Sequence, residues 1–395
     1  MYGGVWASFI VSFVSVGWWS TLGDRRGRKI PLFFSVLGAM FTDLMYLIVA
    51  NTSPSQEDAH DVLSLGLIVG GLLGGYATYN GAVHAYAFDV SPTPLSRLVF
   101  FGLIDALSLI GFIIGAIVGK VTRYNLSYVF SVVIAIGNLA FIYALLPESL
   151  EQQYSAGPVV PQRSVFKSIF SPISVFFRGP GSSKYLPLFG LAFYTYSLTS
   201  AMETSLLRWT DMSPFFPGLP RAVLLVVSRV LELATLLCII PGIAWFWAQY
   251  GTISPERAGL QLSASLSQNS ILIAAVSSTG VLVFCLPDHA KLLFALFAPL
   301  YPLTVGAGPA LYALGAAYLV ALGRKSEVGV LFGAMAVWGE LALMYSYLTY
   351  GAGQGIFFES AFFLVVSLML LLPDPPPVRE EASQASVEAD AAADV

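Results

Sequence analysis

The side chains of this chain that could carry chemistry lie inside long apolar runs. A charged residue at the centre of a hydrocarbon layer costs roughly 2.5–3.5 kcal/mol on insertion scales, so such residues mark substrate or proton pathways, or pair with one another. Arg229 and Glu232 are three residues apart, so they can neutralise each other on one helix or contact a substrate. The ionisable residues of the apolar runs are Asp43, His84, Asp105, Glu203, Arg229, Glu232, Glu340 and Glu359.

The elements that position these residues are membrane-spanning helices, as composition and length indicate. Of the 395 residues, 56% are hydrophobic and 11% are charged, whereas soluble proteins carry about 25% charged residues. The apolar runs have about 20 residues, the length that crosses a membrane as a helix. We therefore expect an all-α integral membrane protein with about eleven transmembrane helices. Their expected ranges are 3–22, 30–50, 62–87, 99–119, 126–146, 185–207, 221–247, 264–285, 291–321, 328–350 and 356–372.

Other chemistries are disfavoured by the residues present. Cys238 and Cys285 lie in apolar runs, which is typical of buried small side chains rather than of a disulfide. The histidines have no metal-ligand spacing, and neither a P-loop nor an intramembrane catalytic cluster occurs in the sequence. We expect no enzyme activity, metal, cofactor or nucleic-acid partner.

Lysine and arginine residues are concentrated in one set of loops, which the positive-inside rule assigns to the cytoplasm. This assignment places the C-terminus in the cytoplasm and Met1 on the opposite side. The plasma membrane and the vacuolar membrane are both compatible with these loops.

Charges crowd the residues from Gly23 to Lys29, between two apolar runs, and indicate a tight turn at a membrane surface. The run Gly23-Asp24-Arg25-Arg26-Gly27-Arg28-Lys29 resembles the loop after the second helix of the major facilitator superfamily, whose pattern is G-x-L-[AS]-D-R-x-G-R-[RK]. Ser20 stands for the leading Gly of the pattern, and Gly23 for its Ala or Ser. Because the loop follows the first span here, the resemblance implies a chain that lacks the first family helix.

In that family the turn holds the cytoplasmic ends of the two halves together in one state and releases them in the other. The resemblance implies this gating role, with a role in topology alone as the alternative, for Gly23, Asp24, Arg25, Gly27, Arg28 and Lys29. Ala85–Pro92, followed by Arg97, looks like the end of the fourth family helix. Asp89 is therefore expected to pair with Arg25 or Arg28 in a contact that forms and breaks with the transport cycle, with an unpaired surface charge as the alternative.

Three glycines, Gly111, Gly115 and Gly119, recur on one helical face, which favours close helix–helix packing. Antiporters of the family carry G-P-x-x-G-G in the corresponding span. Ala116 replaces the Pro and Lys120 the last Gly, which argues against antiport.

The pattern Leu146-Pro147-Glu148-Ser149 resembles the end of the first half in several branches of the family, sugar porters included. The chain has Leu372–Pro375 in place of the PETKG-like ending of those porters. It is more similar to fungal-type members related to hippocampus-abundant-transcript and tetracycline-efflux-like transporters. The residues that carry this likeness are Ser228-Arg229, Gly306-Ala307-Gly308 and Trp338-Gly339-Glu340.

The longest cytoplasmic connection divides the expected spans into groups of five and six. We expect an N-terminal bundle at 1–148 (family helices 2–6) and a C-terminal bundle at 185–373 (family helices 7–12). The linker, 149–184, contains an apolar segment at 165–177 that is too short to span and is expected to lie along the membrane. The polar tail, 374–395, is expected to be a disordered cytoplasmic segment.

The resemblance implies a secondary active transporter that moves a small organic molecule by alternating access, driven by protons. Asp105, Glu203 and Glu340 lie on helices that line the family's central cavity, where a carboxyl group can take up and release a proton. A helix–helix hydrogen bond from a protonated acid is the alternative. Asp43 lies on a helix that is peripheral in the family, where structural pairing is expected.

The expected partners are H⁺, a small-molecule substrate and the lipid bilayer. Asn80 and His84 are expected to belong to the same substrate or proton pathway as the acids, Arg229 and Glu232. Aromatic side chains that could line a pocket for an amphipathic substrate are Tyr76, Tyr79, Tyr194, Tyr196, Tyr301, Tyr312 and Trp338. The alternative functions are a non-transporting truncated membrane protein or interaction scaffold, and a sugar-type porter.

Overall fold

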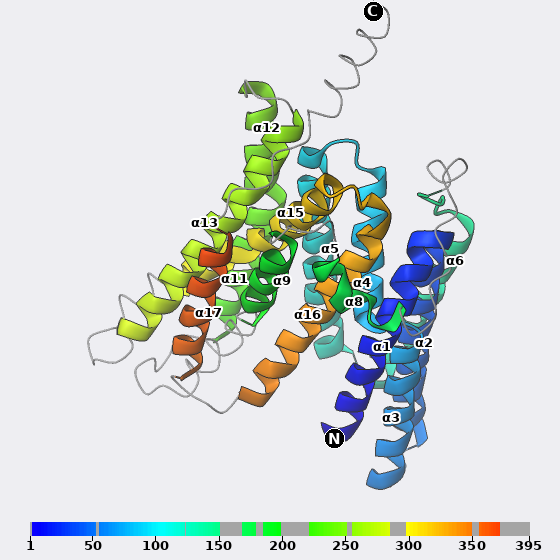
Figure 1. The fold of residues 1–395 in the computed structure, drawn as a ribbon. Helices are drawn as coiled ribbons and strands as arrows, with labels where there is room; N and C mark the ends of the chain where they lie inside the picture. The colour runs from blue at the N-terminus through cyan, green and yellow to red at the C-terminus, as the bar shows by residue number, and fades with distance from the viewer. Residues whose placement is uncertain are drawn as a thin grey trace, which may run out of the picture.

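All regular elements that the computed structural model describes are helical (Figure 1). The structure describes residues 2–52, 55–122, 124–150, 168–178, 185–198, 221–250, 255–284, 298–349 and 355–371. A helix satisfies its backbone hydrogen bonds within one segment, as a chain in hydrocarbon must. Six described segments are long and apolar enough to cross a membrane, and the other expected spans stay predictions. The six are Lys29–Thr52, Gln56–Val90, Pro94–Val121, Asn125–Ala144, Val226–Tyr250 and Pro302–Ala321.

The first group of helices contains α1 (Tyr2–Arg26), α2 (Lys29–Thr52), α3 (Gln56–Leu72), α4 (Gly75–Val90), α5 (Pro94–Val121) and α6 (Tyr124–Ala144). Within it, α2 packs against α3, α4 and α6, and α1 packs against α3 and α4. These contacts make the first of two helical bundles.

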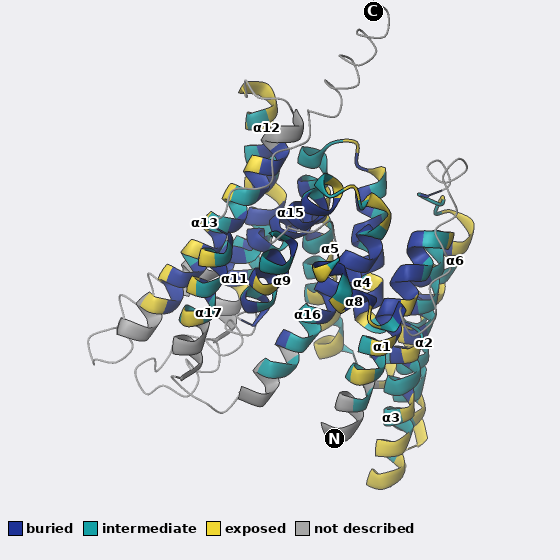
Figure 2. Ribbon diagram, in the orientation of Figure 1, coloured by how far each residue is buried: buried dark blue, intermediate teal, exposed yellow. Residues whose placement is uncertain are grey.

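The second group begins after α8 (Ser171–Phe177). It contains α9 (Tyr185–Ser197), α11 (Arg221–Ala234), the π-helix η1 (Thr235–Ile239), α12 (Ile240–Tyr250), α13 (Pro255–Phe284), the 3₁₀-helix η2 (Ala298–Gly306), α15 (Ala307–Ala321), the 3₁₀-helix η3 (Lys325–Glu327), α16 (Val328–Thr349) and α17 (Gly355–Leu371). Here α13 packs against α15 and α17, and α9 packs against α16 and α17. Figure 2 shows burial that is nearly continuous along α15.

The two groups meet along α4, α5 and α16, which lie between them in Figure 1. Helix α16 packs against α1 and α4, and α5 packs against α13 and α15. Aromatic rings fill this contact: the ring centroid of Phe332 on α16 lies 5.6 Å from that of Phe101 on α5 and 6.3 Å from that of Phe88 on α4. The apolar core therefore runs through the contact between the groups.

The segment expected as one span at 62–87 is two helices with a break at Gly74 and Gly75. Their φ angles are +120° and +59°, which side chains other than glycine rarely tolerate. Hydropathy does not detect this break, because the residues on both sides of it are apolar. Gly75 lines a pocket described below.

Close backbone packing occurs at glycines other than those expected. A Cβ at Gly81 of α4 would lie 2.7 Å from the backbone nitrogen of Gly333 on α16. No heavy atom of the described residues lies within 4 Å of a Cβ built at Gly111, Gly115 or Gly119. The close helix packing expected for those three is therefore not seen in the described part of the chain. Their spacing defines a helix face of small residues but does not determine which helix packs against it.

Helix α8 docks across the contact between the groups. The hydroxyl of Ser171 donates to the carbonyl oxygen of Gly17 on α1 at 3.2 Å. On the other side, Arg324 donates from Nη1 to the carbonyl oxygens of Val175, at 3.0 Å, and Arg178. This part of the expected interfacial segment is thus held to both groups, while 165–167 lie outside the described residues.

Candidate functional site

Three side chains, Asp24, Arg28 and Asp89, form a buried ionic cluster, here called the Asp24 network. Arg28 donates from Nε to Asp89 Oδ2 at 2.9 Å and pairs with Asp24 through Nη1. Arg28 is thus the observed partner of Asp89 out of the two expected ones. Burial lowers the pKa of the Arg28 guanidinium, but Asp24 and Asp89 outweigh it and hold the pKa above its ordinary value. The guanidinium therefore stays charged.

The turn between α1 and α2 positions these groups. Gly27 has φ +115°, a conformation that favours glycine, and it separates the two helices. Glu148 accepts hydrogen bonds from the backbone nitrogens of Arg28, at 2.7 Å, and Lys29, at 3.2 Å. These amides belong to the start of α2, where the helix supplies no acceptor. Glu148 therefore caps α2, a role that the sequence pattern did not indicate.

Asp24 also holds the start of α16. Its carboxylate oxygens accept from the backbone nitrogens of Gly329 at 2.9 Å and Val330 at 3.0 Å. Helix α16 begins at Val328, so these amides have no partner inside the helix. A carboxylate is favoured at such a helix end because the helix dipole is positive there. Asp24 thus ties α1 of the first group to α16 of the second.

The remaining residues of the two charged motifs support the same end of the molecule. Lys29 donates from Nζ to the carbonyl oxygen of Tyr143 at 3.3 Å. The guanidinium carbon of Arg97 lies 4.2 Å from the ring centroid of Phe88, within range of a cation–π interaction. Gly23 packs close to Pro31, where a Cβ would lie 3.0 Å from the Pro31 ring.

A second buried cluster lies at the contact between the groups. His84 on α4 is fully buried, and its Nε2 lies 3.7 Å from Oδ1 of Asp105 on α5. The His84 ring stacks on Tyr312 of α15, with ring centroids 4.1 Å apart. Asn80 donates to the Tyr312 hydroxyl at 3.4 Å. The structure therefore brings together three of the expected pathway residues, His84, Asp105 and Asn80.

Hydrogen bonding fixes which nitrogen of His84 faces Asp105 as a proton acceptor. The Nδ1 atom lies 2.9 Å from the carbonyl oxygen of Asn80, which can only accept, so Nδ1 carries a proton. The Nε2 atom is buried with no hydrogen-bond partner among the described residues. Asp105 keeps 30% of its side chain exposed. At 3.7 Å the two groups lie just beyond hydrogen-bond distance, so Asp105 must approach Nε2 before a proton on its carboxyl group can be donated to the histidine.

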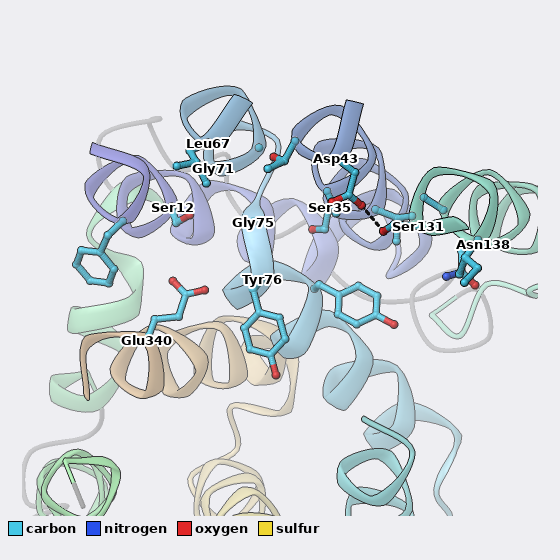
Figure 3. A pocket seen from close by; sticks show the side chains of 18 of the residues that line it. Ser12, Ser35, Asp43, Leu67, Gly71, Gly75, Tyr76, Ser131, Asn138 and Glu340 are labelled. Carbon is cyan, nitrogen blue, oxygen red and sulfur yellow. Dashed lines mark hydrogen bonds between the residues drawn. The ribbon is translucent and has the colours of Figure 1, made fainter. Parts of the chain in front are cut away.

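A pocket of about 600 Å³ lies farther along α4, between α1, α2, α3, α4, α6 and α16. Figure 3 shows Glu340 and Tyr76 on one side of it and Asp43 and Ser131 on the other. Asp43 accepts a hydrogen bond from Ser131, which is the structural pairing expected for that acid. Tyr76, Asn80 and His84 are spaced by four, so they share one face of α4. That face leads from the pocket to the His84 cluster.

The other expected residues that the structure describes form contacts of their own, and Tyr196 lies within electrostatic range of both Asp105 and Glu232. Arg229 and Glu232 form an ion pair at 2.6 Å within α11, the self-paired arrangement. Tyr194 and Trp338 form an edge-to-face pair, and the Tyr196 hydroxyl donates to the carbonyl oxygen of Thr304 at 3.3 Å. Glu203 and the side chains of Tyr301 and Glu359 lie outside the described residues.

No protein-family model matches the chain. The chain is 26% identical over 176 residues to the mouse (Mus musculus) lysosomal proton-coupled steroid conjugate and bile acid symporter SLC46A3. The match covers 44% of this chain and 37% of the mouse protein. The chicken (Gallus gallus) SLC46A3 is 25% identical over 224 residues, which are 52% of this chain and 46% of that protein. The chain thus matches less than half the length of these relatives.

Solved structures align over nearly the whole chain. The human organic anion transporter MFSD10 (TETRAN) has a TM-score of 0.68 and 17% identity, over 94% of this chain and 83% of that one. A bacterial homologue of the iron transporter ferroportin in an outward-facing state has a TM-score of 0.66 and 11% identity, over 94% and 89%. The proton:xylose symporter XylE has a TM-score of 0.64 and 11% identity, over 94% and 85%. This chain therefore has the two-bundle major facilitator fold of a multi-pass membrane protein.

Proposed function

We propose that this chain is a secondary active transporter, or the larger part of one, which couples movement of a small organic molecule to protons. The fold supports alternating access, in which two bundles rock about a site near the middle of the membrane. The observation that carries the proton coupling is the pairing of the buried His84 with the partly exposed Asp105 at the contact between the bundles.

The Asp24 network fits the role of a gate in this cycle. It joins α1 to α16 through two hydrogen bonds to backbone amides, and both must break if the bundles separate at this end. The released groups are a charged carboxylate and free amides, which water solvates well once the end opens. The gate can therefore open without leaving a buried charge unpaired, since Arg28 keeps Asp89 as its partner.

The His84 cluster fits a proton site because its members come from both bundles. His84 and Asp105 belong to the first group and the stacked Tyr312 to the second. Rocking would change the distance between Tyr312 and the pair, and with it the access of water to Asp105. A carboxyl group whose hydration alternates can take a proton on one side and release it on the other.

The test uses the full chain in proteoliposomes with the pH-sensitive dye pyranine inside. A steroid sulfate, a bile acid and tetraphenylphosphonium are added in turn under an inward proton gradient. We expect one of them to drive proton entry that Asp105→Asn and His84→Gln abolish. Glu57→Gln, which changes an exposed carboxylate at the start of α3, is the matched control.

Substrate-driven proton entry that persists in Asp105→Asn would contradict the role of this pair. Proton entry at the rate of protein-free vesicles with all three compounds would favour the non-transporting alternative, an interaction scaffold.

The bundle boundaries at 148 and 185 belong to the same proposal, as does a cytoplasmic C-terminus. The loops rich in lysine and arginine support this orientation, with the Asp24 network on the cytoplasmic side. The plasma membrane and the vacuolar membrane remain the proposed locations.

A further inference from the structure

The pocket between α1, α2, α3, α4, α6 and α16 has the size of a small-molecule site. Its volume of about 600 Å³ falls inside the range of roughly 300–1,000 Å³ found for ligand pockets. It lies about 16 Å along α16 from the Asp24 contact, at a rise of 1.5 Å for each of the residues between Gly329 and Glu340. That depth is close to the middle of a membrane.

The charged side chains of its described lining are all acidic. Two carboxyl groups, Asp43 and Glu340, face it, whereas its described lining residues include no lysine, arginine or histidine. An anionic ligand would meet repulsion that low dielectric strengthens, and no opposite charge would offset its loss of hydration. A cation would meet attraction at both ends of the pocket.

The uncharged lining is amphipathic. Phe9, Tyr76 and Tyr79 offer aromatic faces, and Leu67 and Met344 offer apolar surface. Hydroxyl groups also line it, among them those of Ser12, Ser35 and Thr42. Aromatic faces attract organic cations through their ring quadrupole, most strongly where water is excluded.

We propose that this pocket binds an amphipathic organic cation, an ammonium or phosphonium group carried on an apolar body. The inference rests on the proposed function, because it names the substrate class of the pocket that adjoins the proton pathway. It gives this chain a substrate of opposite charge to the organic anion in the name of human MFSD10.

Glu340 and Tyr76 form the cationic end of the site. They lie side by side at the pocket (Figure 3), and Tyr76 keeps 61% of its surface exposed, so its ring is free to receive a ligand. Asp43 already accepts a hydrogen bond from Ser131, so it contributes to the electrostatic field in the pocket rather than to a direct contact with the ligand. The ligand's apolar body lies along Leu67 and Met344.

The experiment measures binding rather than transport. Tetraphenylphosphonium is titrated into the detergent-solubilised full chain by isothermal calorimetry, and an aromatic sulfonate of similar size is the anionic probe. We expect saturable binding of the cation and none of the sulfonate. Glu340→Gln removes one charge-assisted contact and is expected to weaken binding about tenfold or more.

Two further variants sharpen the result. Asp43→Asn is expected to weaken binding less than Glu340→Gln does, because Asp43 acts at a distance. Glu57→Gln, whose carboxylate is exposed and outside the pocket, is expected to bind as the unmodified chain does. The thermal midpoint of each variant, followed by tryptophan fluorescence, shows whether the bundle is intact.

Equal cation binding by all variants of intact fold would overturn the proposal, as would tighter binding of the sulfonate. If the cation binds as expected but none of the three compounds drives proton entry in vesicles, the proposed transport function fails while the pocket assignment stands. If a bile acid or steroid sulfate drives proton entry and the cation does not bind, the transport function stands and the pocket assignment fails.

Discussion

Removing the charge of Asp24 tests whether the Asp24 network holds the two bundles together. Asp24→Asn keeps the shape of the side chain but leaves one acceptor oxygen, so one hydrogen bond from the α16 amides becomes neutral and the other is lost to a side-chain NH2 group that only donates. Bonds to charged groups are worth about 1.5–3 kcal/mol each and neutral ones about 0.5–1.5 kcal/mol. The two amides of α16 should together lose about 2.5–4.5 kcal/mol, since Asp24 is buried and little of this is screened. The closed state at this end should therefore weaken roughly 60- to 1,600-fold relative to the open state.

The assay measures a distance across this end of the molecule. Spin labels at Arg26→Cys on α1 and Ser326→Cys on η3 occupy exposed positions in different bundles. Native Cys238 and Cys285 are replaced by serine so that only these two sites are labelled. Pulsed electron–electron double resonance in proteoliposomes should show a population at longer label–label distance in Asp24→Asn, and this population should be minor in the parent chain.

Glu57→Gln serves as the control, because this exposed carboxylate lies on α3, away from α16. An unchanged distance distribution in a folded Asp24→Asn protein would refute the reasoning. It would mean that apolar contacts between α4 and α16 alone set the closed state.

Three further outcomes follow from local geometry. Gly333→Ala should reduce the free energy of unfolding by about 1–3 kcal/mol and lower the thermal midpoint, because its Cβ would enter the contact with α1. Gly339→Ala is the control and should leave the midpoint unchanged, because a Cβ there faces open space among the described residues. Gly74→Ala should destabilise the chain by about 1–3 kcal/mol, since φ is +120° there, and denaturant unfolding would show it. Arg324→Ala should loosen α8 by about 2 kcal/mol, seen as faster hydrogen exchange of its amides. Exchange in Lys325→Ala, an exposed neighbour, should match the parent, and equal exchange in both variants would contradict this account.

Much of the charged turn was predictable from the sequence. Charges that cannot lie in hydrocarbon must form a turn, and an acid at the end of the next span is a natural partner for its arginine. That argument left Arg25 and Arg28 as candidate partners of Asp89, and the structure shows Arg28 in that place. The contact of Asp24 with α16 does not, because its partners are backbone amides, which every residue except proline carries.

The His84 cluster was only partly predictable. Polar residues in apolar runs identified His84, Asp105 and Asn80 as candidates, but no spacing rule joins residues of different helices. The stacking of Tyr312 on His84 depends on how α15 packs against α4 and α5.

Glycine spacing was also a limited guide to helix packing. It marked a face of small residues on α5, whereas the close contact lies at Gly81 and Gly333. A spacing defines a surface, and only the tertiary fold supplies what covers it.

The way Asp24 is held has a consequence for how relatives of this chain can vary in sequence. Because the carboxylate is bound by amides of the main chain, the hydrogen bond from position 330 does not depend on the side chain there, proline excepted. Packing limits that side chain instead, since Val330 is buried in the apolar core. Position 329 is different, since a Cβ there would meet the Arg28 guanidinium and the Asp24 carboxylate. Covariation between positions should therefore reveal no charged partner for Asp24 on α16, although Arg28 pairs with it within the first group. On the α16 side of the contact, relatives should keep a small residue at position 329. Such a position is easily mistaken for one without a role.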